Sequence, residues 1–161
     1  PAMPYPCATL EFKGYEMAYT EPYAADWDAL PNVAMPFMNT VHSEELALVS
    51  RLLTDLETAA APATIDAQVA AWVEHTKAHF AREERLMHQY DFFATPCHQG
   101  EHETALLQLL GVQQQWLRER DTAMLQDYIQ YWREWLQQHI SSMDFVTANF
   151  LSQLNVEVEL T

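Results

Sequence analysis

The chain of 161 residues is poor in glycine and in basic residues. With only three glycines, it can form neither a glycine-rich phosphate loop nor a dinucleotide-binding fingerprint. Eight lysines and arginines stand against 23 aspartates and glutamates, which gives a formal net charge of −15. Because contacts to phosphate need clustered lysine and arginine, this balance argues against nucleic acid and against anionic membrane surfaces as partners.

Long apolar runs are also absent, since no stretch approaches the roughly 20 residues that a transmembrane helix needs. The N-terminus lacks the basic segment and the apolar stretch of a signal peptide. These absences favour a cytoplasmic location with no membrane partner. The two cysteines, Cys7 and Cys97, fit no metal-ligand spacing, and the sequence leaves open whether they are free thiols or a disulfide.

What the sequence does contain is a series of amphipathic helical patterns. They follow an extended arm rich in proline and tyrosine, residues 1–34. The predicted helices run from about Pro36 to the run Ala59–Ala63, from Thr64 to about Tyr90, from Thr95 to about Arg118 and from Asp121 to about Gln153. The expected N-caps of the last three are Thr64, Thr95 and Asp121. We expect an all-α, up-down-up-down four-helix bundle over residues 35–153, with residues 154–161 as a tail or the start of a linker.

Histidine is the unusual residue type, with seven occurrences. In an antiparallel helical hairpin, residues equidistant from the loop lie at the same height. Across the three predicted loops, the histidines that pair in this way are His42, His79, His102 and His139. Glu83 and His98 are equidistant from the second loop, and Asp144 lies at nearly the depth of His98. The bundle therefore gathers these seven residues into two adjacent layers.

Helical spacing also places most of these side chains on common faces. The pairs four residues apart are His79 with Glu83 and His98 with His102. His139 and Asp144 are five apart, about 140° around an ideal helix, and a local bulge in the fourth helix would bring them together. Glu84 and His88, also four apart, are expected to form a surface pair.

Imidazole suits iron, zinc, copper or nickel, and bridging carboxylates suit paired metal ions. Seven ligands are too many for one ion, whereas bundle interiors host di-metal carboxylate sites. Suppose that Glu83, Asp144 and one solvent oxygen bridge two irons. The iron held by three histidines then has six ligands, and the iron held by two has five. The open position of the second iron is where O₂ would bind.

The pattern His42, then His79-x3-Glu83, His98-x3-His102 and His139-x4-Asp144, resembles the ligand set of the hemerythrins, and more specifically of the bacterial hemerythrin domains. Trp27, upstream of His42, also matches that family's N-terminal segment. The resemblance covers about residues 24–153. It implies a non-haem centre of two iron ions with a bridging oxo or hydroxo group, which binds O₂ and cycles between diferrous, oxy and diferric states.

The resemblance also implies a role for each residue. One iron is held by His98, His102 and His139, the other by His42 and His79, and the bridges are Glu83 and Asp144. Apolar or aromatic side chains near the ligands are candidates for the wall of the O₂ pocket: Leu46, Phe80, Trp135, Leu136 and Ile140.

Glu45 departs from the family's pattern, which usually has an apolar residue three positions after the first histidine. This spacing shares a helix face with His42, so Glu45 can approach the iron held by two histidines. It would then ligate the iron, hydrogen-bond to its ligand, or admit water and protons, and each would favour rapid oxidation. Alternatively, Glu45 turns outward as a carboxylate of the first helical turn. We favour this second interpretation because burying an unpaired charge is costly.

Several functions fit such a centre. The favoured hypothesis is an O₂- or redox-responsive domain whose longer native protein carries a C-terminal signalling output domain. A free-standing O₂ carrier or store, and a di-iron oxidase or peroxidase, are the alternatives. The domain is not expected to be an enzyme by itself, and the sequence does not give its oligomeric state.

Overall fold

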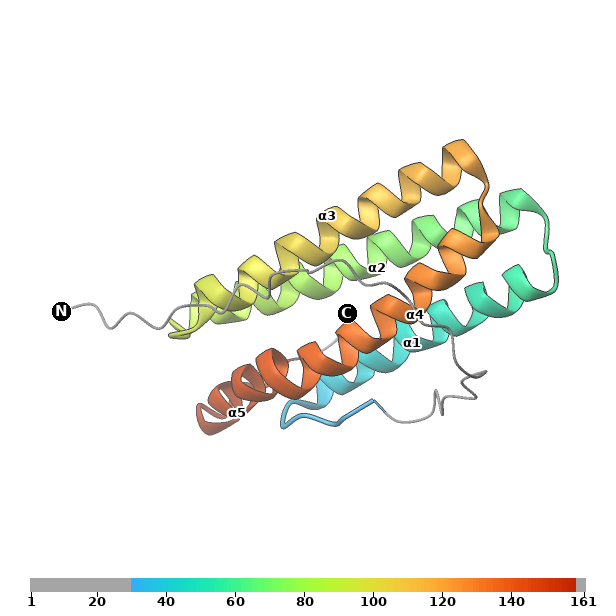
Figure 1. The fold of residues 1–161 in the computed structure, drawn as a ribbon. Coiled ribbons are helices and arrows are strands. Elements are labelled where there is room, and N and C mark those ends of the chain that lie inside the picture. Colours follow the sequence, from blue (N-terminus) through green and yellow to red (C-terminus); the bar gives the residue numbers. More distant parts are fainter. Residues whose placement is uncertain (1–29, 159–161) are drawn as a thin grey trace.

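Four long antiparallel rods of helix make up most of the part that the computed structural model describes, residues 30–158. The elements are α1 (Pro36–Glu57), α2 (Pro62–Gln89), α3 (Thr95–Glu119), α4 (Thr122–His139), a π-helical turn (Ile140–Asp144) and α5 (Phe145–Gln153). The last three follow one another without a break and together form the fourth rod. The connecting loops alternate between the two ends of the bundle (Figure 1). The predicted all-α, up-down-up-down bundle is confirmed.

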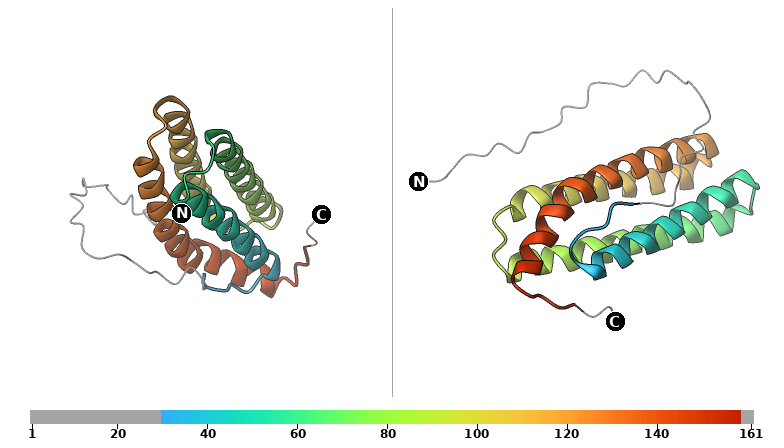
Figure 2. Two further views of the ribbon diagram at one scale, coloured as in Figure 1. Left: turned by 90° about the vertical axis from the view of Figure 1, so that its right-hand side faces the viewer. Right: turned by 90° about the horizontal axis from the view of Figure 1, so that it is seen from below.

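Each helix packs against its neighbour in sequence, and α1 closes the ring by packing against α4. The apolar stripes of the four rods meet in one core, whose largest fully buried side chains include Trp72, Trp132 and Met38. Seen from below, the segment before α1 runs beside α4 (Figure 2, right). Val33 anchors this segment, because its N–H donates to Asn39 Oδ1 and its carbonyl accepts from Asn39 Nδ2, at 2.8 and 2.9 Å.

The helix starts were predicted with mixed success. Asp121 caps α4 as expected, since its side chain accepts the N–H of Met124 at 3.0 Å. Thr64 is not a cap, because α2 begins at Pro62, where the fixed φ of proline suits a first helical turn. Thr95 is the first residue of α3 rather than its cap.

The predicted bulge in the fourth rod is confirmed as the π-helical turn between α4 and α5. A π turn holds one residue more than an α turn, so it rotates Asp144 back onto the face of His139. None of the described helices is long and apolar enough to cross a membrane. Cys7, Trp27 and most of the predicted arm lie outside the described residues. The one cysteine among the described residues, Cys97, is not a free thiol.

Candidate metal centre

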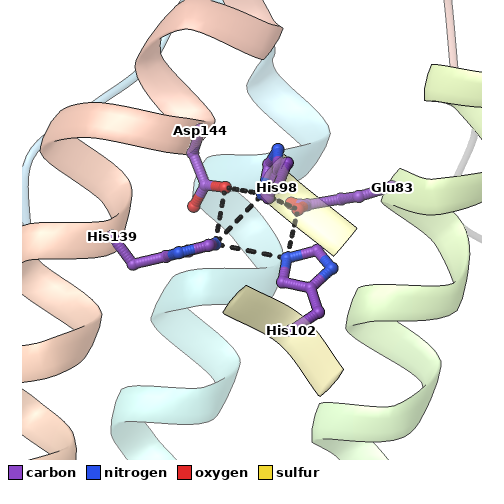
Figure 3. A group of neighbouring side chains, drawn as sticks. All are labelled: Glu83, His98, His102, His139 and Asp144. Atoms are coloured by element: carbon purple, nitrogen blue, oxygen red, sulfur yellow. Dashed lines mark hydrogen bonds and ion pairs between the residues drawn. The ribbon is translucent and has the colours of Figure 1, made fainter. Parts of the chain in front are cut away.

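All seven predicted ligands are buried and meet at the centre of the bundle. Their ligand atoms form two overlapping groups, within each of which all atoms lie within 4.8 Å of one another. The larger group is Glu83, His98, His102, His139 and Asp144 (Figure 3). The smaller group is His42, His79, Glu83 and Asp144. The two carboxylates therefore belong to both groups, and every rod of the bundle supplies at least one of the seven residues.

Asp144 turns one oxygen to each group. Its Oδ1 lies 3.1 Å from Nε2 of His98 and 3.2 Å from Nε2 of His139, in the larger group. Its Oδ2 lies 3.1 Å from Nε2 of His42, in the smaller group. This division is how a carboxylate bridges two adjacent cations.

Glu83 divides its oxygens in the same way. Oε1 lies 3.1 Å from Nε2 of His79. Oε2 lies 3.5 Å from Nε2 of His98 and 3.4 Å from Nε2 of His102. The i, i+4 spacing on α2 sets the first contact, and the packing of α2 against α3 sets the other two.

The residues fit a metal because their inward atoms converge without satisfying one another. Glu83 Oε2, both oxygens of Asp144 and Nε2 of His42 are buried without a hydrogen-bond partner of suitable geometry. Nε2 of His139 lies 3.1 and 3.2 Å from the Nε2 atoms of His98 and His102, so three ring nitrogens converge on one point. Buried polar atoms are normally satisfied, and a site for an ion is a recognised reason when they are not. Cations in the two groups would satisfy all of them.

The outward nitrogens of four of these rings each have a fixed partner. The Nδ1 contacts are His79 to Glu45 at 3.1 Å, His98 to Thr147 at 2.9 Å, His102 to Glu84 at 3.2 Å and His139 to Glu101 at 2.9 Å. A hydrogen bond donated from Nδ1 to such an acceptor leaves Nε2 free to ligate and fixes the plane of the ring.

Sequence reasoning missed most of these partners. The predicted surface pair of Glu84 with His88 is wrong, because Glu84 contacts His102 and His88 contacts Gln99 instead. The partners lie on neighbouring helices, so helical spacing alone does not reveal them.

In the metal-free protein, the histidines and carboxylates of the cluster shift one another's pKa values. Burial lowers the pKa of His139, but the carboxylates of Asp144, Glu101 and Glu83 together outweigh it and raise the pKa to about 9. Burial likewise opposes the rise in the pKa of His79 caused by Glu83 and Glu45. Burial and the Asp144 charge would raise the pKa of Glu83, yet the imidazoles of His79 and His102 keep it below its usual range. Burial lowers the pKa of His102 to about 4.

Glu45 corrects the favoured prediction, because it is fully buried rather than turned outward. It lies well inside α1, not in the first turn. Its Oε2 lies 3.1 Å from Nδ1 of His79, and three N–H or O–H groups donate to its Oε1: those of Trp132, Thr76 and Trp72. These partners offset the cost of burial. Burial raises the pKa of Glu45, but the hydrogen bond from His79 and the nearby imidazoles lower it overall.

The predicted pocket residues fall into two places. Phe80 stacks on His102 with ring centres 3.9 Å apart, and the partly buried Trp135 stacks on His139 at 4.7 Å. Ile140 is fully buried in the π turn beside the ligands. Leu46 and Leu136 instead line a cavity of about 10 Å³ beside Glu45, close to the smallest space that holds one water, roughly 10–15 Å³.

Comparisons with known proteins show the family to which the chain belongs. The model of the family described as Hemerythrin HHE cation binding domain matches residues 35–151. A bacteriohemerythrin of Aquifex aeolicus (strain VF5) is 31% identical over 124 residues, covering 71% of this chain and 88% of that protein. A bacteriohemerythrin of Ralstonia nicotianae is 31% identical over 83 residues, covering 52% of this chain and 60% of its own. No solved structure matches the chain significantly. The chain belongs to the hemerythrin family of cation-binding domains.

Proposed function

We propose that this chain is a non-haem di-iron protein that binds O₂ and works as an O₂- or redox-responsive domain. The observation that carries the proposal is the sharing of Glu83 and Asp144 between two buried groups of histidines. Shared carboxylates suit a pair of hard metal ions, and imidazole suits iron. Both relatives are bacteriohemerythrins, which supports the same interpretation.

In this proposal the histidines divide between the two irons. His98, His102 and His139 would hold one, and His42 and His79 the other. Glu83, Asp144 and an oxo or hydroxo group would bridge them. When bound, the iron pair would supply the electrons for a reversible reaction with O₂. The group with two histidines offers one nitrogen donor fewer, so its metal would have the open position.

The protein's own residues would protect this reaction. Phe80 and Ile140 are buried against the ligands and exclude water from the centre. The Nδ1 partners keep four of the five imidazoles aimed inward, those of His79, His98, His102 and His139, so that these rings would not rearrange when the charge of the centre changes.

The buried Glu45 favours a responsive role over an O₂ carrier. A carboxylate behind a ligand would stabilise the more positive, oxidised centre, so the oxidised centre would return less readily to the reduced form that binds O₂. In the responsive role, the domain would pass its oxidation state to a signalling output domain of a longer protein.

The experiment is to load iron, reduce the protein without oxygen, admit air and record absorption over time. Prompt conversion to a stable oxidised spectrum supports a responsive domain. A long-lived, reversible oxygenated spectrum would support a carrier instead. Continuous consumption of O₂ or peroxide with a supplied reductant would indicate an oxidase or peroxidase.

A further inference from the structure

Glu45 is a buried carboxylate that belongs to neither ligand group. The ring of His79 connects it to the cluster: Nδ1 lies 3.1 Å from Glu45 Oε2, and Nε2 lies 3.1 Å from Glu83 Oε1. Since an ionised carboxylate only accepts hydrogen bonds, Nδ1 of His79 carries a proton, and Nε2 is the nitrogen that would bind a metal. Glu45 therefore acts on the cluster through His79.

The other oxygen of Glu45 is held by donors from two further helices. Trp132 Nε1 on α4 donates to Oε1 at 2.9 Å, and Thr76 Oγ1 and Trp72 Nε1 on α2 donate at 3.3 and 3.4 Å. His75 approaches Oε2 from the surface side, with Nε2 at 4.0 Å. With both oxygens engaged, the carboxylate is fixed behind His79 and is not free to become a ligand.

The two ligand groups differ in the charge that stands behind them. In the larger group, Glu84 behind His102 and Glu101 behind His139 have side chains 26% and 39% exposed. Water and salt screen such charges. His98 has only the neutral hydroxyl of Thr147. Glu45, whose side chain is 0% exposed, is screened by neither, so its effect on the attached imidazole is the strongest of the set.

We propose that Glu45 is a positioning residue that fixes His79 and strengthens it as a donor, so that the metal position of His42 and His79 favours the higher-valent ion. The proposal rests on the function proposed above. A carboxylate that accepts the outer N–H of a ligating histidine raises the basicity of the inner nitrogen and fixes the orientation of the ring. The two metal positions are then electronically unequal, and Glu45 sets part of the difference.

The test compares Glu45→Gln with the matched control Glu101→Gln, which makes the same change behind His139, where water screens the charge. The first readout is the stepwise affinity of the metal-free protein for zinc, which does not depend on iron chemistry. We expect Glu45→Gln to weaken one of the two binding steps by about 10–100-fold. Glu101→Gln should weaken its own step clearly less.

The second readout is the pair of one-electron reduction potentials of the iron-loaded protein. Glu45→Gln should raise one of them by the equivalent of about a tenfold change, or about 59 mV for one electron. Thr76→Val keeps the side-chain shape and removes a donor from Glu45, which leaves more charge for His79. Thr76→Val should therefore lower the same potential. A loosened fold would not produce this opposite shift, so the test stays decisive even if Glu45→Gln does not fold.

The outcomes separate the two proposals. The role of Glu45 would be overturned if Glu45→Gln left both zinc affinities and both reduction potentials unchanged, or if it changed both zinc affinities equally. Either result would leave the di-iron proposal standing. A wild-type protein that binds only one metal ion would overturn the di-iron proposal, and the proposed role of Glu45 with it.

Discussion

Asp144 lies five residues after His139, yet its Oδ1 is 3.2 Å from Nε2 of that histidine. The π-helical turn Ile140–Asp144 makes this contact by adding one residue to the helix where the ligands meet. The same turn leaves Oδ2 of Asp144 facing His42, 3.1 Å away on α1. A single local change in helix geometry thus lets one carboxylate serve both ligand groups.

This sharing predicts different losses for two substitutions. His42 belongs to one group, so His42→Ala should leave about one tightly bound zinc per chain. Asp144 belongs to both, so Asp144→Asn should weaken both binding steps. Elemental analysis and stepwise zinc titration measure the difference. Equal losses in the two variants would contradict the assignment of Asp144 as the shared ligand.

The metal-free protein should lose stability between about pH 6.5, the ordinary pKa of histidine, and about pH 9. The pKa of His139 is raised to about 9, and that of His79 is also raised. A histidine whose pKa is raised by folding stabilises the fold fully at a pH below its unfolded pKa. This stabilisation is lost as the pH rises through its folded pKa. The lowered pKa of His102, about 4, changes the stability only between about pH 4 and 6.5, so it does not offset this loss. Denaturant unfolding in a chelator at pH 6.5 and 9 measures it.

Metal binding should show the reverse trend over the same range. Ligating imidazoles must be neutral, so metal binding displaces the protons of His79 and His139 and tightens as pH rises. Proton release on adding zinc in weak buffer provides a direct count. Zinc affinity that falls between pH 6.5 and 9 would mean that these two imidazoles do not ligate.

Phe80 should matter for stability as well as for the centre. It is buried and stacks on the His102 ring with ring centres 3.9 Å apart. Phe80→Ala should lower the free energy of unfolding by about 3–5 kcal/mol, since it opens a cavity in the core. It should also speed the oxidation of the iron-loaded protein by admitting water. Phe80→Leu is the control, with smaller effects on both, and an unchanged oxidation rate in Phe80→Ala would argue against a shielding role.

Asp121→Ala tests the start of α4. The side chain of Asp121 accepts the N–H of Met124, so its loss should cost about 1 kcal/mol. The cap lies at the far end of α4 from His139, and zinc affinity should not change. A loss of zinc binding equal to that of His42→Ala would show that zinc affinity follows global stability. Differences in zinc binding among the other variants would then not identify individual ligands.

The convergence of the seven side chains was predictable because it depends on counting. Residues equidistant from a loop meet in a helical hairpin, so His79 and His102 could be paired without coordinates. The bulge before Asp144 followed from the same reasoning, because five residues do not fit one helix face. The orientation of Glu45 was not predictable in this way. Its burial depends on donors from α2 and α4 that meet only in the folded bundle, such as Trp132, 87 residues away in sequence.

In the proposed function the two ligand groups hold one bridged pair of irons, and the magnetic state of the oxidised protein distinguishes such a pair from separate ions. Iron analysis together with electron paramagnetic resonance of the ferric protein would measure it. We expect two irons per chain and almost no ferric signal, because bridged ferric ions couple to a non-magnetic ground state. One iron per chain, or two irons with the full signal of isolated ferric ions, would contradict it.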